Sequence, residues 1–148
     1  MTSHEFRVEP GHVLAFARAV GDENLVAASP AVGTVVPTTF PSAAVQYDPK
    51  HMQGMRASGA LADSPRDRGS VLHAEQHFEY SRPVRVGDQL TVEEFEGRRW
   101  RKESRRAGSL NFREVVKEYR DQSGEIVIRS RMVLVETEFA VSDGTGST

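Results

Sequence analysis

The stretch Val71-Leu-His-Ala-Glu-Gln-His-Phe-Glu-Tyr-Ser-Arg-Pro-Val-Arg-Val-Gly-Asp-Gln-Leu90 predicts one long strand, a turn and the start of a second strand. Pro83 has no backbone N–H to donate, so we expect the first strand to end before it and Gly87-Asp88 to close the turn. Apolar and polar side chains alternate through the first half, which is typical of an antiparallel sheet that packs on one side. The more apolar set is Leu72, Ala74, Gln76, Phe78 and Tyr80.

The C-terminal half of the chain continues this β pattern. Further strands are expected at residues 90–96, 109–120 and 125–136. The last of these is apolar on both faces near its two ends, which favours a central position in the sheet. The run Asp-Gln-Ser-Gly at residues 121–124 is a strong hairpin signal between the last two strands.

The helices are expected in the N-terminal half. Residues 4–9 predict a short strand or extended lead-in, and a helix should begin at Pro10 and end at Gly21. Residues 22–37 are interrupted by Gly and Pro and predict a loop. A second helix is expected to begin at Thr38 or Thr39, with Phe40 on its buried side. The remaining segments are an irregular excursion over residues 47–70 and a flexible polar tail over residues 140–148.

Composition limits the classes of function. The chain has 148 residues, a net charge of -2 and 27% charged residues, so no overall field points to nucleic acid or to a membrane surface. It has no cysteine, which excludes disulfides, thiolate metal sites and a cysteine nucleophile. We find no membrane-spanning run and no N-terminal apolar segment. The sequence therefore predicts a cytoplasmic protein without a cofactor or a metal.

Two motifs in the opening stretch resemble a known family. The runs Leu72-His73-Ala74-Glu75-Gln76 and Arg82-Pro83-Val84-Arg85-Val86-Gly87-Asp88 are similar to those of MaoC-like dehydratases, in their N-terminal or helper half, except that Ala74 replaces a Gly. The resemblance implies an α+β hot-dog fold over residues 1–139, in which an antiparallel sheet wraps a central helix. A further family run corresponds to Val36-Pro37-Thr38-Thr39-Phe40 and implies that the helix beginning there is the central one.

The resemblance also bears on catalysis. Catalytic MaoC-like domains carry an Asp-x-Asn-Pro-x-His loop after the first helix, whose Asp and His hold the reacting water. In this chain Asp22 and Asn24 match that loop, whereas Leu25 replaces the Pro and Ala27 replaces the His. An alanine methyl group cannot transfer a proton, so we assign no catalytic residue and expect Asp22 to be a turn or cap residue.

What the resemblance then implies is a non-catalytic subunit or half-site of an (R)-specific enoyl-thioester hydratase or 3-hydroxyacyl-thioester dehydratase. Its partner would be a catalytic MaoC-like subunit or a second copy of itself, and its substrate an acyl thioester of coenzyme A or of acyl carrier protein. A stand-alone hot-dog thioesterase, with Asp48 as its carboxylate, and a non-enzymatic acyl-binding homodimer are the alternatives. His51 is the candidate replacement base.

Several residues are candidates for substrate binding. Residues 98–106 are strongly basic, and predict either a solvated hairpin end or a contact for phosphates or for an acidic carrier protein. Trp100 in this run is a candidate for stacking on adenine. His73 and His77 share a strand face but lie about 13 Å apart, too far to bind one metal together. The substrate-binding candidates are Pro37, Thr38, Thr39, Phe40, His73, Arg101 and Arg105.

Overall fold

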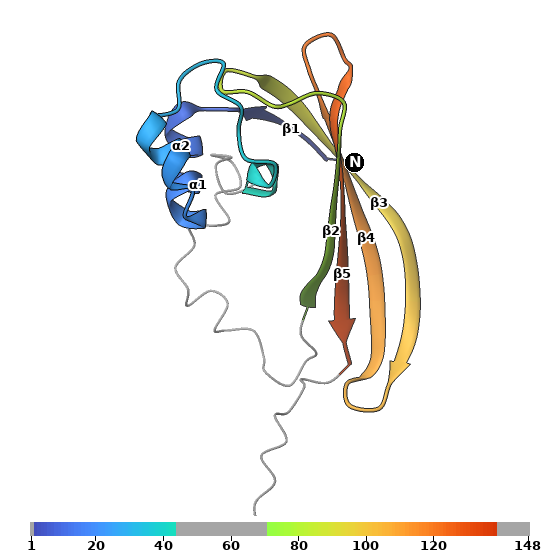
Figure 1. Ribbon diagram of the computed structural model, residues 1–148. Coiled ribbons are helices and arrows are strands. Elements are labelled where there is room, and N and C mark those ends of the chain that lie inside the picture. Colours follow the sequence, from blue (N-terminus) through green and yellow to red (C-terminus); the bar gives the residue numbers. More distant parts are fainter. Residues whose placement is uncertain (1, 44–70, 139–148) are drawn as a thin grey trace, which may run out of the picture. The chain divides into compact units, whose positions relative to one another are not determined.

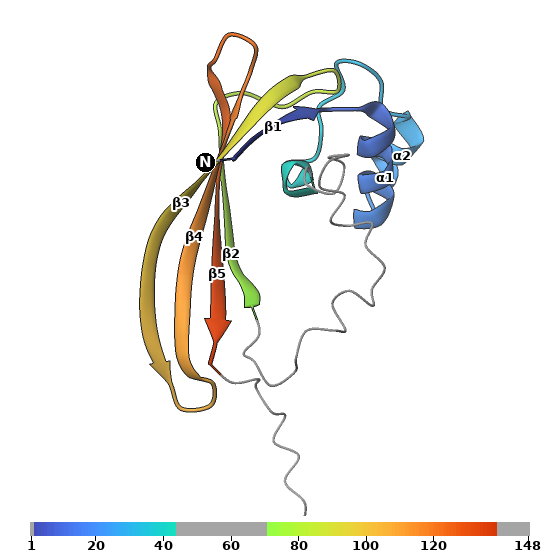
Figure 2. The same cartoon turned by 180° about the vertical axis from the view of Figure 1, so that it is seen from behind.

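The computed structural model describes residues 2–43 and 71–138 (Figure 1). These residues contain a five-stranded sheet of order β1-β3-β4-β5-β2, and Figure 2 shows the same elements from behind. No helix in these ranges is long and apolar enough to span a bilayer. The elements are β1 (Thr2–Arg7), α1 (Pro10–Val20), α2 (Glu23–Ala28), the 3-10 helix η1 (Phe40–Ala43), β2 (Val71–Tyr80), β3 (Gln89–Ser104), β4 (Gly108–Arg120) and β5 (Ile126–Thr137).

Several predicted elements are confirmed. The strand expected at residues 71–80 is β2, and α1 runs from Pro10 to a C-cap at Gly21, where φ is 75°. In the hairpin between β4 and β5, the Gly124 N–H donates to the Asp121 carbonyl at 2.9 Å. β5 lies between β4 and β2, so its central position is confirmed. Residues 47–70 and 140–148 lie outside the described residues.

The predicted end of β3 is wrong. We expected the strand to stop at residue 96, before the basic run, but β3 continues to Ser104. Trp100 accounts for the extension, because it stacks on Phe112 of the neighbouring strand with ring centroids 5.0 Å apart and planes 2° apart. Cross-strand aromatic pairs of this kind stabilise a sheet even where the flanking residues are charged. Of the basic residues, only Arg105 and Arg106 fall in the turn.

The predicted loop over residues 22–37 is wrong in its first part, where the chain forms α2. The Asp22 carboxylate accepts a hydrogen bond from the Leu25 N–H at 3.0 Å and so caps this helix. The cap satisfies one of the N–H groups that a helix leaves without partners in its first turn. The cap role expected for Asp22 is confirmed. The second predicted helix is present as η1, which begins at Phe40.

The described residues form two compact units, and strands β2 to β5 each contribute to both. The first unit contains described residues 2–43, 78–94 and 117–129. The second unit contains described residues 71–77, 95–116 and 130–138. The prediction of a single domain over residues 1–139 stays a prediction.

Phe40 lies in the core of the first unit. Its side chain is 0% exposed, and its ring centroid lies 5.7 Å from that of Phe6 on β1 and 5.5 Å from that of Phe16 on α1. Phe6 also contacts Tyr119 on β4 edge to face. Because β1 pairs with β3 so that Phe6 is opposite Leu90, the aromatic cluster joins the sheet to the helices of this unit.

The Arg-Pro and Gly-Asp motifs form a turn in the first unit. The Asp88 carboxylate accepts from both Arg82 Nη atoms, at 2.8 and 3.3 Å, and from the Arg85 N–H at 2.9 Å. These bonds close the turn from Arg82 to Asp88, and the hydrogen bond to Asp88 raises the pKa of Arg82. The motif that carries much of the family resemblance therefore has a structural role here.

A buried carboxylate organises the second unit. The Glu114 side chain is 6% exposed and accepts from Nη2 of Arg98 and Nη1 of Arg131, each at 3.0 Å. The hydrogen bonds from Arg98 hold the pKa of Glu114 well below its usual range, at about 2. Gly97 lies directly opposite, and a Cβ atom at that position would be 2.7 Å from the Cβ of Glu114. Only glycine lets β3 approach this carboxylate.

Gly97→Ala is therefore expected to destabilise the protein by about 1–3 kcal/mol, because the methyl group forces the two strands apart. Urea unfolding monitored by circular dichroism measures this loss. Gly11→Ala is the matched control, since a Cβ at Gly11 in α1 meets nothing within 4 Å. That change should be neutral or stabilising by up to about 1 kcal/mol. Equal stability of the Gly97→Ala variant and the wild type would contradict the close approach.

Candidate functional site

Two tyrosines hold the segment that leads into η1. The Tyr80 hydroxyl donates to the Thr38 carbonyl, and the Tyr119 hydroxyl donates to the Pro41 carbonyl at 3.0 Å. Burial raises the pKa of Tyr80 to about 12 and also raises the pKa of Tyr119 above its ordinary value. Both hydroxyls are therefore protonated at neutral pH and remain donors.

The four candidates in this segment differ in exposure. Phe40 is fully buried in the core and Pro37 is partly buried, whereas Thr38 and Thr39 are exposed. The Pro37 carbonyl accepts the Phe40 N–H at 3.0 Å, so the segment is held by its own backbone as well as by the tyrosines. The two threonine hydroxyls are thus presented to solvent from a fixed backbone, where they can donate or accept hydrogen bonds.

Asp22 and Ala27 are the positions that correspond, by the sequence resemblance, to the catalytic Asp and His of MaoC-like domains. Asp22 is the N-cap of α2, and Ala27 lies within α2. The Asp22 carboxylate is engaged in capping the helix, and Ala27 is exposed near its C-terminal end. Leu25, which replaces the family's Pro, packs against the core of the first unit. The side chains present here can neither form an Asp-His pair nor move a proton through one.

The other titratable candidates among the described residues do not form a catalytic or metal site. His73 lies 3.1 Å from the Glu75 carbonyl and His77 lies 3.1 Å from the Glu75 carboxylate, and all three side chains are exposed on β2. Within residues 2–43 and 71–138 no three His, Cys, Asp or Glu side chains are grouped to hold a metal. His51 and Asp48 lie outside the described residues.

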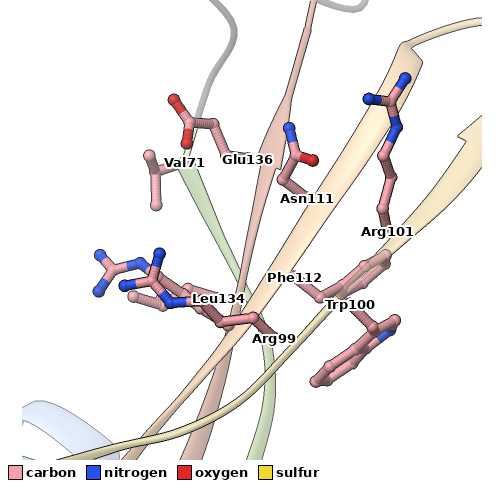
Figure 3. Close-up of a pocket in the computed structure, with 9 residues that line it drawn as sticks. Val71, Arg99, Trp100, Arg101, Asn111, Phe112, Leu134 and Glu136 are labelled. Atoms are coloured by element: carbon pink, nitrogen blue, oxygen red, sulfur yellow. The ribbon is translucent and has the colours of Figure 1, made fainter.

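A hollow of about 460 Å³ opens on the second unit (Figure 3). Arg101 lines it, as do Arg99 and Trp100, whereas the candidates His73 and Arg105 do not. Trp100 has one face stacked on Phe112, which removes that face from any role in binding adenine. Arg113 and Asn111 also line the hollow and were missed from the sequence. Their alternation along β4 indicates that both side chains point to the same face of the strand. The sequence of β4 alone does not show that this strand lies beside β3, which follows from the strand order.

The chain belongs to a known family. A family model described as FAS1-like, dehydratase domain region, matches residues 1–130. The chain is also similar to a UPF0336 protein of Streptomyces avermitilis, with 38% identity over 87 residues that cover 52% of this chain and 52% of that protein. The chain thus spans about half the length of the curated relatives it matches.

Solved structures with the same fold come from Mycobacterium tuberculosis. The ChsH1-ChsH2 complex matches with a TM-score of 0.66 and 16% identity, over 97% of this chain and 89% of that chain. The C-terminally truncated HadBC (3R-hydroxyacyl-ACP dehydratase) complex matches with a TM-score of 0.57 and 19% identity, over 89% and 90%. The α+β hot-dog fold and the resemblance to MaoC-like dehydratases are confirmed.

Proposed function

We propose that this chain is the non-catalytic half of an (R)-specific enoyl-thioester hydratase or 3-hydroxyacyl-thioester dehydratase. The observation that carries this proposal is the state of the loop after α1, where Asp22 caps a helix and Ala27 replaces a proton-transferring His. Membership of the dehydratase-region family supports the reaction class. The substrate would be an acyl thioester of coenzyme A or of acyl carrier protein.

Hydration of an enoyl thioester sets clear chemical demands. A base must activate water, an acid must protonate the α carbon, and donors must stabilise charge on the thioester oxygen. The second catalytic group is missing at position 27, so the base and the acid must come from elsewhere. A catalytic MaoC-like partner chain supplies both groups in this proposal.

The segment from Thr38 to Ala43 is the part of this chain best suited to line the acyl pocket. Its exposed threonines lie directly before a helix turn, and Tyr80 and Tyr119 fix the backbone carbonyls on both sides of Phe40. A rigid wall keeps the acyl chain in one orientation while the partner performs the proton transfers. The test of this role is whether hydration, absent from the isolated chain, returns when a catalytic partner is added.

The proposal requires an assembly, and β2 offers an edge for it. β2 is an outer strand of the described sheet, and it carries two exposed apolar side chains, Val71 at 56% and Leu72 at 50%. Natural proteins seldom leave such an edge uncovered. The two M. tuberculosis structures named above are themselves complexes, which supports a partner subunit. A second copy of this chain is the other occupant of the same edge.

Analytical ultracentrifugation at micromolar concentration should therefore show a homodimer of this chain, or a heterodimer when the catalytic partner is present. Leu72→Lys is expected to shift the distribution towards the monomer, because a charge at the edge opposes strand pairing. Val20→Lys is the matched control, since Val20 is exposed to a similar extent, 55%, at the end of α1. A stable monomer of the wild-type chain, with and without a catalytic partner, would count against the proposed assembly.

A further inference from the structure

The hollow on the second unit is lined by residues of four neighbouring strands, β3, β4, β5 and the edge strand β2. Side chains point to the same face of a strand at every second residue, and six of the nine lining residues form pairs with that spacing, while Trp100 and Phe112 lie between two of the pairs. Arg99 and Arg101 come from β3, Asn111 and Arg113 from β4, and Leu134 and Glu136 from β5. The lining residues thus include three guanidinium groups and an amide but one carboxylate.

The ion pairs of these arginines are weak. Arg99 donates to Glu96 at 2.6 Å with both side chains about two-thirds exposed, and Arg101 donates to the exposed Glu103 at 2.8 Å. Exposed pairs of this kind contribute little, since water competes for both charges. Among the described residues Arg113 forms no ion pair. Each guanidinium carries five N–H donors, so most donors around the hollow are available to a ligand.

The same unit also contains arginines with a clear structural role. Arg98 and Arg131 direct their N–H groups to the buried Glu114 carboxylate, and this cluster does not line the hollow. Among the described residues, the arginines of the hollow have no buried carboxylate as a partner. One of them is nevertheless held in position, because Arg101 also donates to the hydroxyl of the buried Ser109.

We infer that the hollow binds the phosphate group of an organic phosphate. Forked guanidinium donors match phosphate oxygens in pairs, and charge-assisted hydrogen bonds of this kind are about twice as strong as neutral ones. A volume of about 460 Å³ is far more than one phosphate ion fills, and Leu134 and Val71 add apolar wall for the remainder of the ligand. The phosphate can belong to the carrier of a thioester or to a free organic phosphate. The first of these two assignments rests on the proposed function.

The fluorescence of Trp100 gives a test, because Trp100 is the single tryptophan of the chain and lies between Arg99 and Arg101 in the lining of the hollow. The full chain is titrated with coenzyme A, with glucose 6-phosphate and with pantetheine, which lacks phosphate. At least one phosphate compound should change the fluorescence saturably, and pantetheine should not. A response to coenzyme A alone identifies the thioester carrier as the source, and an equal response to glucose 6-phosphate identifies a free organic phosphate.

Arg113→Gln should weaken the binding of the responding phosphate about tenfold, because it removes charge-assisted hydrogen bonds. Arg106→Gln is the matched control: it removes the same charge from the hairpin turn, outside the hollow, and should leave the affinity unchanged. An equal loss in both variants would overturn the site in favour of diffuse surface charge. No response to any phosphate compound at about 1 mM, a concentration at which even weak binding is visible, would also overturn it. The assay uses the isolated chain without turnover, so its failure is distinct from failure of the proposed function.

Discussion

Phe40→Ala should lower the free energy of unfolding of this protein by about 3–5 kcal/mol, which is the usual cost of removing a buried aromatic ring. The Phe40 side chain is 0% exposed and contacts rings from both β1 and α1. Its loss leaves a cavity between the sheet and the helices of the first unit, and also removes two aromatic pairs. A loss of this size is a large fraction of the stability of a typical domain.

Urea unfolding with circular dichroism measures the loss. Val32→Ala is the control, because Val32 is 83% exposed and its truncation should change stability by no more than about 0.5 kcal/mol. Phe40→Leu keeps most of the buried volume and should fold well enough for comparison if the alanine variant does not. A decrease below about 1 kcal/mol for Phe40→Ala would contradict the burial on which the first unit depends.

The second large effect concerns reaction rate. The purified chain should hydrate a short enoyl-coenzyme A no faster than background, because Ala27 cannot activate water. Loss of a positioned base or acid typically lowers the rate about 10²–10⁴-fold, so a chain that lacks one is expected to show no measurable hydration. Adding a catalytic MaoC-like partner should restore hydration, which is followed by the loss of enoyl-thioester absorbance. Full activity of the isolated chain would contradict this expectation, and His51 would then be the first residue to replace.

Local patterns predicted the elements that depend on neighbouring residues. The alternation through residues 71–80, the Pro10 start and Gly21 end of α1, and the hairpin at residues 121–124 all arise from short-range chemistry. α2 was missed because it has only six residues and no buried position, although Asp22 followed by Glu23 is a regular helix-start signal. A helix this short has too few periodic positions for an apolar face to be recognised from the sequence.

The misses in the second unit have a different cause. The charged residues after Gly97 predicted that the strand ends at residue 96. Instead Trp100 stacks on Phe112 of the neighbouring strand, and the backbone of β3 approaches Glu114. Such cross-strand pairs depend on the order and register of the strands, which one strand alone does not encode. For the same reason Arg101 was predicted as a ligand contact together with Arg105, whereas it lines the hollow together with Arg113. The apolar face predicted for β2 is likewise buried only in part, since Leu72 is half exposed.

The central claim is that this chain helps to form the substrate pocket and supplies no catalytic group. Its most direct test is the hydration rate of the assembled complex carrying Asp22→Asn. Asparagine caps a helix about as well as aspartate, so α2 should be retained and any change in rate would report chemistry alone. We predict a rate nearly equal to that of the wild-type complex, whereas the equivalent Asp→Asn change in the catalytic partner should lower the rate about 10²–10⁴-fold. Loss of hydration on changing Asp22, with the partner intact, would contradict the account.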